Sequence, residues 1–417
     1  MVELLSPARD FQSLSAALNN GANSVYIGMQ ECNMRANVSN FSLEDIKTAV
    51  KKVHDFDSRL YVCTNTILKD NDFDLLEKNF PILKEYGVDA VIVSDLGAVE
   101  MARENDLEVH LSVQANISNT RSLKVLKKLG VSRTILSREL SLLEIYELAK
   151  NSPIELEVFV HGALCMAVSG RCFLSSHLYG KSANCGECLQ PCRKNWKLVS
   201  EDEEEFILEG KTEVSGYLDV IKKGKDLKSF EIENTMTRFL SPRDLSMIEY
   251  IPELVKSGVH AFKIEGRARP ADYVATVTRV YREAIDCFET GQWSFQNQWA
   301  DDLKKVFNRG FDQGFYFNNY HQDSPYNQST YVKKDIGQVI NYFNKVKAAE
   351  IRLWDDLKIG DEIIIQGPTT GSITHKVESM EIEGKFLDTA LKNQHVGILI
   401  GQKVRPNDLI YKRIKRV

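Results

Sequence analysis

Residues 156–165 read Leu-Glu-Val-Phe-Val-His-Gly-Ala-Leu-Cys, an apolar stretch that runs into a histidine, a glycine and a cysteine. We interpret Leu156–Val160 as a buried strand, because parallel strands covered on both faces are almost continuous in apolar residues. Similar runs recur along the first 264 residues, at Val2–Leu5, Ser24–Ile27, Leu60–Cys63, Ala90–Val93, Val109–Val113, Thr134–Leu136 and Ala261–Ile264. The stretch is therefore one member of a series of short strands.

Helical patterns separate these strands, at Phe11–Asn19, Ser42–Val53, Phe73–Tyr86, Arg121–Leu129 and Ser141–Ala149. Ser42 with Asp45, and Ser141 with Glu144, have the spacing of capping boxes, which mark helix starts. Strands that alternate with helices indicate a parallel sheet. Eight such strands favour a (β/α)8 TIM-like barrel over an open sheet.

Five of the eight cysteines lie directly after the 156–160 strand, at Cys165, Cys172, Cys185, Cys188 and Cys192. Thiolates are the ligands of zinc and of iron–sulfur clusters. The gap of six residues between Cys165 and Cys172 is wide for a zinc knuckle, so an iron–sulfur cluster is favoured over zinc and over incidental thiols. Spacing alone does not decide which four of the five thiols are ligands.

Functional residues of such barrels lie at the carboxyl ends of the strands. The polar residues there are Arg35, Asn65, Asp95, Gln114, Arg138, His161, Lys263, Glu265 and Arg267. Several cations at one mouth suit an anionic ligand, and arginine forks match carboxylates. Two alternatives stay open: His161 is a proton donor or a structural histidine, and Glu265 is functional or only an ion-pair partner.

The composition changes twice along the chain. We expect a barrel domain over 1–292 with a cysteine-rich insertion at 163–255 folded over its mouth, a connector over 293–330, and a small all-β barrel over 331–417. Within the insertion, the acidic run Asp202–Glu205 is interpreted as a solvated turn. The basic tail Lys412–Val417 is interpreted as a solubilising terminus or an RNA contact.

Charge and hydropathy exclude several classes of protein. The net charge of −5 gives no overall attraction to nucleic acid, so RNA binding would need a local basic patch. No apolar run is long enough for a membrane helix, and the N-terminus lacks a signal-peptide pattern, so we expect a cytoplasmic protein. The motifs of zinc proteases, of serine-hydrolase elbows and of phosphate-binding loops are absent from the sequence.

The sequence resembles the collagenase-like peptidase U32 family. The signature runs from Glu157 through Phe159, Gly162 and Cys165 to Gly170-Arg171-Cys172 and Ser175. Further landmarks cover nearly the whole chain: Leu4–Ala8, Val25–Gly28, Asn33–Ala36, Asn40-Phe41, Leu111–Gln114, Cys188–Arg193, Phe262–Arg267 and Asn308–Phe317. The branch that it resembles is that of the prephenate-dependent tRNA hydroxylation proteins.

The resemblance implies an enzyme that hydroxylates the wobble uridine of tRNA to 5-hydroxyuridine without oxygen. It implies a 4Fe–4S cluster on Cys165, Cys172, Cys188 and Cys192, with prephenate as hydroxyl donor. The segment Asn234–Arg238, where some relatives have a ligand, has no cysteine, and Cys185 remains an alternative thiol. We assign Arg35, Lys263 and Arg267 to the carboxylates of prephenate, Gln114 to its orientation, and Glu265 and His161 to catalysis.

Two other functions are kept as alternatives. The first is a U32-type peptidase, as the older family label suggests. The second is a non-catalytic iron–sulfur accessory protein of an RNA-modification complex. The expected partners are tRNA and prephenate, and the sequence leaves open a homo-oligomer or a hetero-oligomer with a paralogous subunit.

Overall fold

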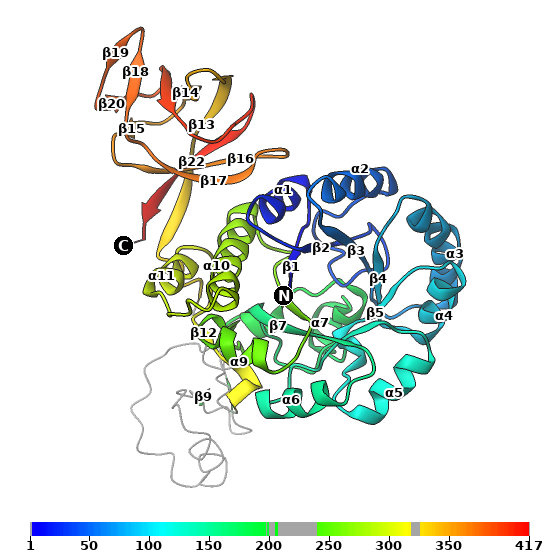
Figure 1. Cartoon of the computed structure of the whole chain (residues 1–417). Coiled ribbons are helices and arrows are strands. Elements are labelled where there is room, and N and C mark those ends of the chain that lie inside the picture. Colours follow the sequence, from blue (N-terminus) through cyan, green and yellow to red (C-terminus); the bar gives the residue numbers. More distant parts are fainter. Residues whose placement is uncertain (1, 197, 200–204, 207–239, 318–325, 417) are drawn as a thin grey trace.

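The computed structural model describes residues 2–196, 198–199, 205–206, 240–317 and 326–416 (Figure 1). Apart from Glu205, the acidic run at 202–205 lies outside the described residues, and so does the segment 234–238. Within the described ranges, no helix combines the length and the apolar character needed to cross a lipid bilayer.

Eight parallel strands form a closed barrel, which confirms the predicted fold class. Strands β1 to β7 follow one another around the ring, and β11 pairs with both β7 and β1. Their bounds are β1 (Glu3–Pro7), β2 (Ser24–Gly28), β3 (Arg59–Thr64), β4 (Ala90–Val93), β5 (Val109–Leu111), β6 (Arg133–Ile135), β7 (Glu155–Ala163) and β11 (Ala261–Ile264). Figure 1 looks along the barrel axis and shows the helices as an outer ring.

The helices of that ring begin where the sequence supplies caps. Ser42 and Ser141 form the two expected capping boxes with Asp45 and Glu144. The helices are α1 (Phe11–Asn19), α2 (Leu43–His54), α3 (Asp70–Glu85), α4 (Leu96–Glu104), α5 (Thr120–Lys128), α6 (Leu142–Lys150), α9 (Ile251–Lys256) and α10 (Ala271–Glu289), with α11 (Asn297–Lys305) after them.

Strand β7 extends three residues beyond its expected end at Val160. The extension exists because β10 (Asp244–Ser246) pairs antiparallel with His161, Gly162 and Ala163, and β12 (Phe311–Asp312) pairs with β10. Two segments distant in sequence thus widen the barrel wall beside the first cysteine of the insertion.

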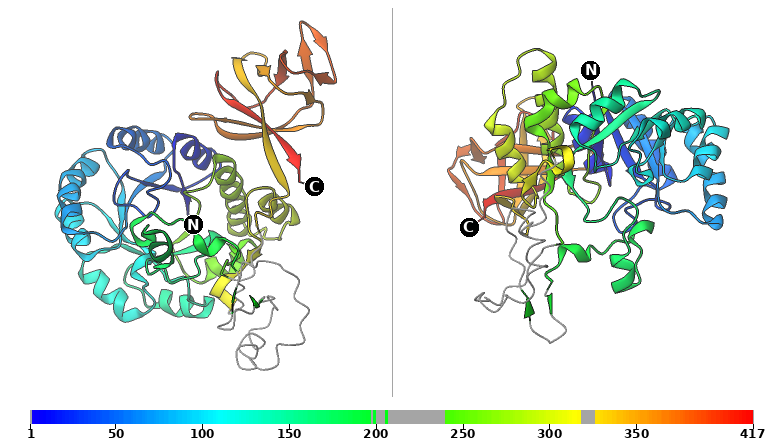
Figure 2. Two further views of the ribbon diagram at one scale, coloured as in Figure 1. Left: turned by 180° about the vertical axis from the view of Figure 1, so that it is seen from behind. Right: turned by 90° about the horizontal axis from the view of Figure 1, so that it is seen from below.

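The insertion that begins after β7 contains the short helix α7 (Leu174–Tyr179) and single turns at Ala183–Cys185 and Pro191–Arg193. The pair β8 (Leu198–Val199) and β9 (Glu205–Phe206) forms a small antiparallel hairpin. In Figure 1, α7 overlies the barrel opening, and the view from below in Figure 2 shows it to one side of the barrel.

Residues from Tyr331 onward form antiparallel sheets with their own apolar core, which includes Ile351, Ile365 and Val396. The strands are β13 (Tyr331–Phe343), β14 (Ala348–Leu353), β15 (Leu357–Lys358), β16 (Glu362–Gly367), β17 (Gly371–Lys376), β18 (Met380–Ile382), β19 (Lys385–Phe386), β20 (Thr389–Ala390), β21 (His395–Leu399) and β22 (Leu409–Lys415). Residues 412–415 of the basic tail therefore belong to β22, and Lys412 and Arg413 pair with Asp361 and Glu362.

The end of the barrel opposite the cysteine-rich insertion is stabilised by one buried guanidinium. Arg133, at the start of β6, is 2% exposed and contacts Glu3 at 2.7 Å, Glu155 at 2.6 Å and Glu157 at 3.5 Å. Burial alone would raise the pKa of Glu3, but hydrogen bonding and attraction to Arg133 lower it to about 2. Glu3 and Glu155 thus depend on Arg133 for compensation, whereas Glu157 also pairs with Lys263 at 2.7 Å.

We predict that Arg133→Met lowers the free energy of unfolding by about 3–5 kcal/mol, because removal of one partner leaves buried charges uncompensated. The measurement is urea unfolding at pH 7. The matched control is Lys150→Met, which breaks an exposed pair with Glu147 and should cost less than about 1 kcal/mol. Equal effects of the two substitutions would contradict the structural role of Arg133.

Candidate functional site

The cysteine-rich insertion lies on the barrel mouth through close backbone contacts. Gly186, with φ of +86°, approaches Asn33 so closely that a Cβ would stand 2.3 Å from its carbonyl oxygen. Gly170, with φ of +74°, lies against Gln114 in the same manner, with 2.8 Å to Cγ. Asn116 also donates to the carbonyl of Ser169 at 3.0 Å. Only glycine fits at these two positions without strain, so the loop is held over the strand ends.

Four thiols of the insertion influence one another electrostatically. Burial raises the pKa of Cys188, and the neighbouring Cys165 and Cys172 raise it further. Burial likewise raises the pKa of Cys192, against the effect of Arg193, and Cys165, Cys188 and Cys172 add to it. The backbone N–H of Gln190 also donates to Cys188 Sγ at 3.4 Å. These four thiols therefore lie in one neighbourhood.

The fifth thiol of the insertion, Cys185, ends the turn Ala183–Cys185 and is not among the main influences on Cys188 or Cys192. Among the residues that the structure describes, no three Cys, His, Asp or Glu side chains are arranged as a site for a metal ion.

A buried carboxylate next to the thiols is surrounded by three arginines. Arg35 Nη2 lies 2.8 Å from Glu265 Oε1. Burial alone would raise the pKa of Glu265, but Arg35, Arg138 and Arg267 outweigh it and lower the pKa to about 2. The pKa of Arg35 is raised by Glu265 and also by Cys165. This arginine–glutamate cluster (Arg35, Arg138, Glu265 and Arg267) is therefore positive overall and adjoins the thiols.

The expected cations differ in whether a carboxylate already neutralises them. Arg35 pairs with Glu265, and Lys263 Nζ lies 2.7 Å from the fully buried Glu157. Arg267 instead donates to Asn33 Oδ1 at 3.2 Å, and its close approach requires Gly28, where a Cβ would stand 2.2 Å from Nη1. Of these three, Arg267 is the one without a carboxylate at ion-pair distance within the described ranges.

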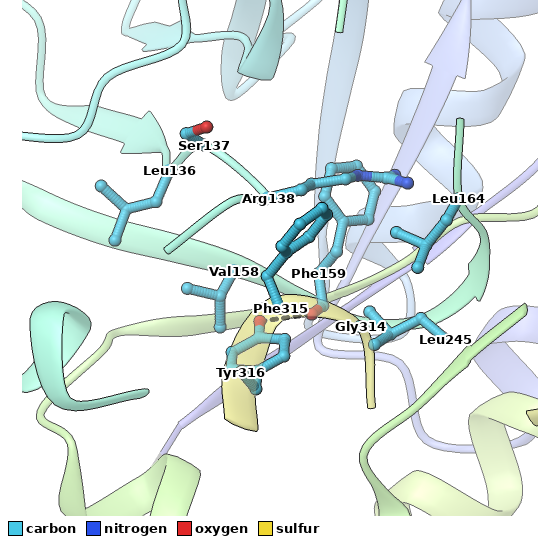
Figure 3. A pocket seen from close by; sticks show the side chains of 10 residues that line it. All are labelled: Leu136, Ser137, Arg138, Val158, Phe159, Leu164, Leu245, Gly314, Phe315 and Tyr316. Atoms are coloured by element: carbon cyan, nitrogen blue, oxygen red, sulfur yellow. Dashed lines mark hydrogen bonds between the residues drawn. The ribbon is translucent and has the colours of Figure 1, made fainter. Parts of the chain in front are cut away.

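Arg138 likewise has no carboxylate at ion-pair distance in the described residues; the sequence placed it at a strand end but assigned it no role. Its guanidinium stacks 3.8 Å above the Phe159 ring, and Nη1 donates to the Ala163 carbonyl at 2.7 Å. Its buried Nε has no hydrogen-bond partner in the described residues. Figure 3 shows Arg138 beside Phe159 and Phe315, and a cavity of about 40 Å³ is lined by both Arg138 and Cys165. Position at a strand end was its only sequence signal.

The polar amides at the mouth form a local network. Gln114 Oε1 accepts hydrogen bonds from Ser112 and, at 3.3 Å, from Asn65 Nδ2. The carboxamide nitrogen of Gln114 is then left as a donor for a ligand. Asp95, by contrast, caps α4 by accepting from Gly97 and Ala98, which is a structural role.

His161 is 1% exposed and packs against Tyr273, Tyr281 and Phe311. Its Nδ1 lies 3.3 Å from the Tyr281 hydroxyl, and burial lowers its pKa to about 3. Because both tyrosines belong to α10, the ring lies between the barrel wall and that helix. This environment is that of a neutral structural histidine, the second of the two alternatives left open by the sequence.

Three of the relatives found by comparison with known proteins align with almost the whole chain. An uncharacterized protease of Methanocaldococcus jannaschii is 45% identical over 99% of this chain and 98% of its own length. A collagenase of Porphyromonas gingivalis is 36% identical over 99% of this chain and 98% of its length. The tRNA hydroxylation protein P1 of Bacillus subtilis is 33% identical over 98% of this chain and 94% of its length.

The names of these relatives divide between proteolysis and tRNA hydroxylation, although all three align with almost the whole chain. The model of peptidase family U32 matches residues 9–325, which include seven of the eight barrel strands and the cysteine-rich insertion. The chain belongs to peptidase family U32.

Proposed function

We propose that the protein hydroxylates the wobble uridine of tRNA to 5-hydroxyuridine, without molecular oxygen and with prephenate as the hydroxyl donor. The observation that carries the proposal is the arginine–glutamate cluster beside Cys165. Three guanidiniums around one carboxylate leave an excess of two positive charges, which suits a dicarboxylate such as prephenate.

Arg138 and Arg267 are the residues that we assign to the two carboxylates. Both lower the pKa of Glu265 by electrostatic attraction. Neither has a carboxylate at ion-pair distance among the described residues. Arg138 also has a buried Nε without an acceptor, which a ligand oxygen would satisfy. Lys263 is a weaker candidate than the sequence suggested, because Glu157 already neutralises it.

Glu265 acts in this proposal as a fixed anion. With a pKa of about 2 it stays ionised at neutral pH, so it holds Arg35 in place rather than exchanging a proton. Gln114 offers its amide nitrogen to the ligand, because Ser112 and Asn65 occupy its oxygen.

The thiols of Cys165, Cys172, Cys188 and Cys192 fit a 4Fe–4S cluster. Repulsion among the thiolates is relieved by a cationic centre, which opposes the rise in the pKa of Cys188 and Cys192. The N–H of Gln190 would donate to a ligated Cys188 sulfur. When bound, the cluster supplies one-electron redox chemistry at the mouth.

A peptidase is the second candidate, because two of the three relatives carry protease or collagenase names. It would need a nucleophile and a base within hydrogen-bonding reach. His161 does not provide that base, since it is buried and its hydrogen-bond neighbour is the Tyr281 hydroxyl. We therefore rank tRNA hydroxylation first.

The test is a reaction with protein purified without oxygen, prephenate, and tRNA from cells that lack the gene. We expect 5-hydroxyuridine to form only when prephenate is present. Arg138→Met should lower kcat/KM for prephenate by about 10- to 100-fold, because a hydrogen bond to a charged group contributes about 1.5–3 kcal/mol. The control Arg121→Met, at an exposed position on α5, should leave the rate unchanged.

Two outcomes would contradict these assignments. Absence of 5-hydroxyuridine from a protein that retains its iron would refute the proposed reaction. Formation of the product with an unchanged KM for prephenate in Arg138→Met would keep the reaction but remove Arg138 from the donor site.

A further inference from the structure

A large cavity lies away from the cysteines, between the barrel and the C-terminal sheets. Its volume is about 830 Å³, and it is bordered by α1, α2, α10 and α11 on one side and by β16, β17, β22 and the segment before β22 on the other. Figures 1 and 2 show the C-terminal sheets beside α1, α10 and α11. We call this cavity the interdomain groove.

The two walls of the interdomain groove are fixed to each other. Gly371, with φ of +75°, lies so close to α1 that a Cβ would stand 2.7 Å from Ala16 N. Asn19 donates to the Thr370 carbonyl at 3.1 Å, and Lys333 Nζ lies 2.7 Å from Asp272 on α10. Close backbone contact and a partly buried ion pair make the groove preformed rather than a product of loose domains.

The groove is rich in positive charge although the whole chain is acidic. Six basic side chains line the groove: Lys52, Arg279, Lys305, Lys403, Arg405 and Arg413. Two acidic side chains also line it, Asp302 and Glu362. The two carboxylates are already used, because Asp302 pairs with Arg279 and Lys305, and Glu362 pairs with Arg413. Of the other three cations, Lys52 and Lys403 have no carboxylate at ion-pair distance in the described residues, and Arg405 is attracted to the buried Asp408 without forming a direct ion pair.

Lys52 from α2 and Arg405 from the C-terminal domain both line the groove, and Lys52 Nζ donates to Ser15 Oγ and to the Pro368 carbonyl where the two parts of the chain meet. Neither has a carboxylate at ion-pair distance in the part of the chain that the structure describes. Burial and the proximity of Arg405 both lower the pKa of Lys52, which shows that the two like charges are close. Thr370 accepts from Arg405 Nη1 at 3.3 Å and so fixes the guanidinium without neutralising it.

Such an arrangement is unfavourable in the free protein and is relieved by an anion. Hydroxyl and amide side chains such as Asn20, Thr369 and Gln402 also line the groove and can hydrogen-bond to phosphate and ribose. Phosphate contacts from lysine, arginine and short polar side chains are the usual means of positioning nucleic acid without reading its sequence.

We propose that the interdomain groove binds the phosphate backbone of the RNA substrate, with Lys52, Lys403 and Arg405 as the phosphate contacts. The inference rests on the proposed function for the identity of the polymer. In this arrangement the mouth of the barrel performs the reaction, and the groove holds the RNA some distance from the reacting nucleotide.

The test is binding of fluorescein-labelled unfractionated tRNA, followed by anisotropy over a range of salt concentrations. Removal of Lys403 and Arg405 as Lys403→Gln with Arg405→Gln should weaken binding about tenfold. It should also reduce the slope of log affinity against log salt by about 1 for each cation lost. Arg405→Lys, which keeps the charge, should recover most of the loss.

The matched control removes two charges from the same domain outside the groove, as Lys345→Gln with Lys385→Gln. Both lysines are exposed and neither lines the groove. An unchanged affinity and slope in the groove variant would overturn the proposal, as would an equal loss in the control. Because binding is measured without prephenate, a protein that binds tRNA through the groove but does not hydroxylate it would refute only the proposed reaction.

Discussion

Replacement of any one of Cys165, Cys172, Cys188 and Cys192 by alanine will remove most of the iron from protein purified without oxygen. The wild-type protein should be brown and contain about four iron and four sulfide per chain. The expectation follows from the mutual influence of these four thiols at the barrel mouth. Loss of one thiolate leaves the cluster with an incomplete set of ligands, so the effect should be close to complete.

Cys185→Ala is the matched control, because Cys185 lies in the same insertion but does not act strongly on Cys188 or Cys192. It should keep its iron and its colour. Normal iron in Cys192→Ala together with loss in Cys185→Ala would reassign the fourth ligand. Colourless wild-type protein with one stoichiometric zinc would refute the cluster.

The barrel was predictable because most of its strands lie in short apolar runs that alternate with helical patterns, although β5 and β6 include His110 and Arg133. The elements that the sequence did not reveal have weak or misleading patterns. Helix α11 buries Trp299 and Leu303 as its large apolar side chains, so its periodicity is faint. Strand β22 carries Lys412 and Arg413, whose partners Asp361 and Glu362 lie about 50 residues earlier in the chain, so the run resembled a solvated tail.

The candidate site was predictable to the level of the strand ends and not beyond. That rule located Arg35, Arg138, Glu265 and Arg267 correctly at one mouth. It could not show which cations were already neutralised, because this depends on contacts across the barrel. Lys263 pairs with Glu157 on the neighbouring strand, whereas Arg138 has no such partner in the described residues.

The environment of His161 depends on a local irregularity in strand pairing. Glu157, Phe159 and His161 alternate along β7 and would all face the barrel interior in a regular strand. The register with β11 shifts at this point, from Lys263 opposite Phe159 to Ile264 opposite His161. An extra residue in one strand turns the following side chain to the other face, so His161 contacts α10. Sequence alternation gives no sign of this shift.

The second large effect is expected in cells. Deletion of the gene should abolish 5-hydroxyuridine and its derivatives in tRNA, because the proposed reaction is the step that forms 5-hydroxyuridine. Wild-type protein supplied from a plasmid should restore the nucleosides. Cys165→Ala should not restore them, because it loses a cluster ligand next to Arg35, whereas Cys185→Ala should.

Mass spectrometry of tRNA nucleosides from these four strains is the most direct measurement of the central claim. The account predicts loss of 5-hydroxyuridine derivatives in the deletion strain, recovery with wild type and Cys185→Ala, and no recovery with Cys165→Ala. Unchanged tRNA nucleosides in the deletion strain, together with cleavage of gelatin by the purified protein, would contradict it and identify the protein as a peptidase.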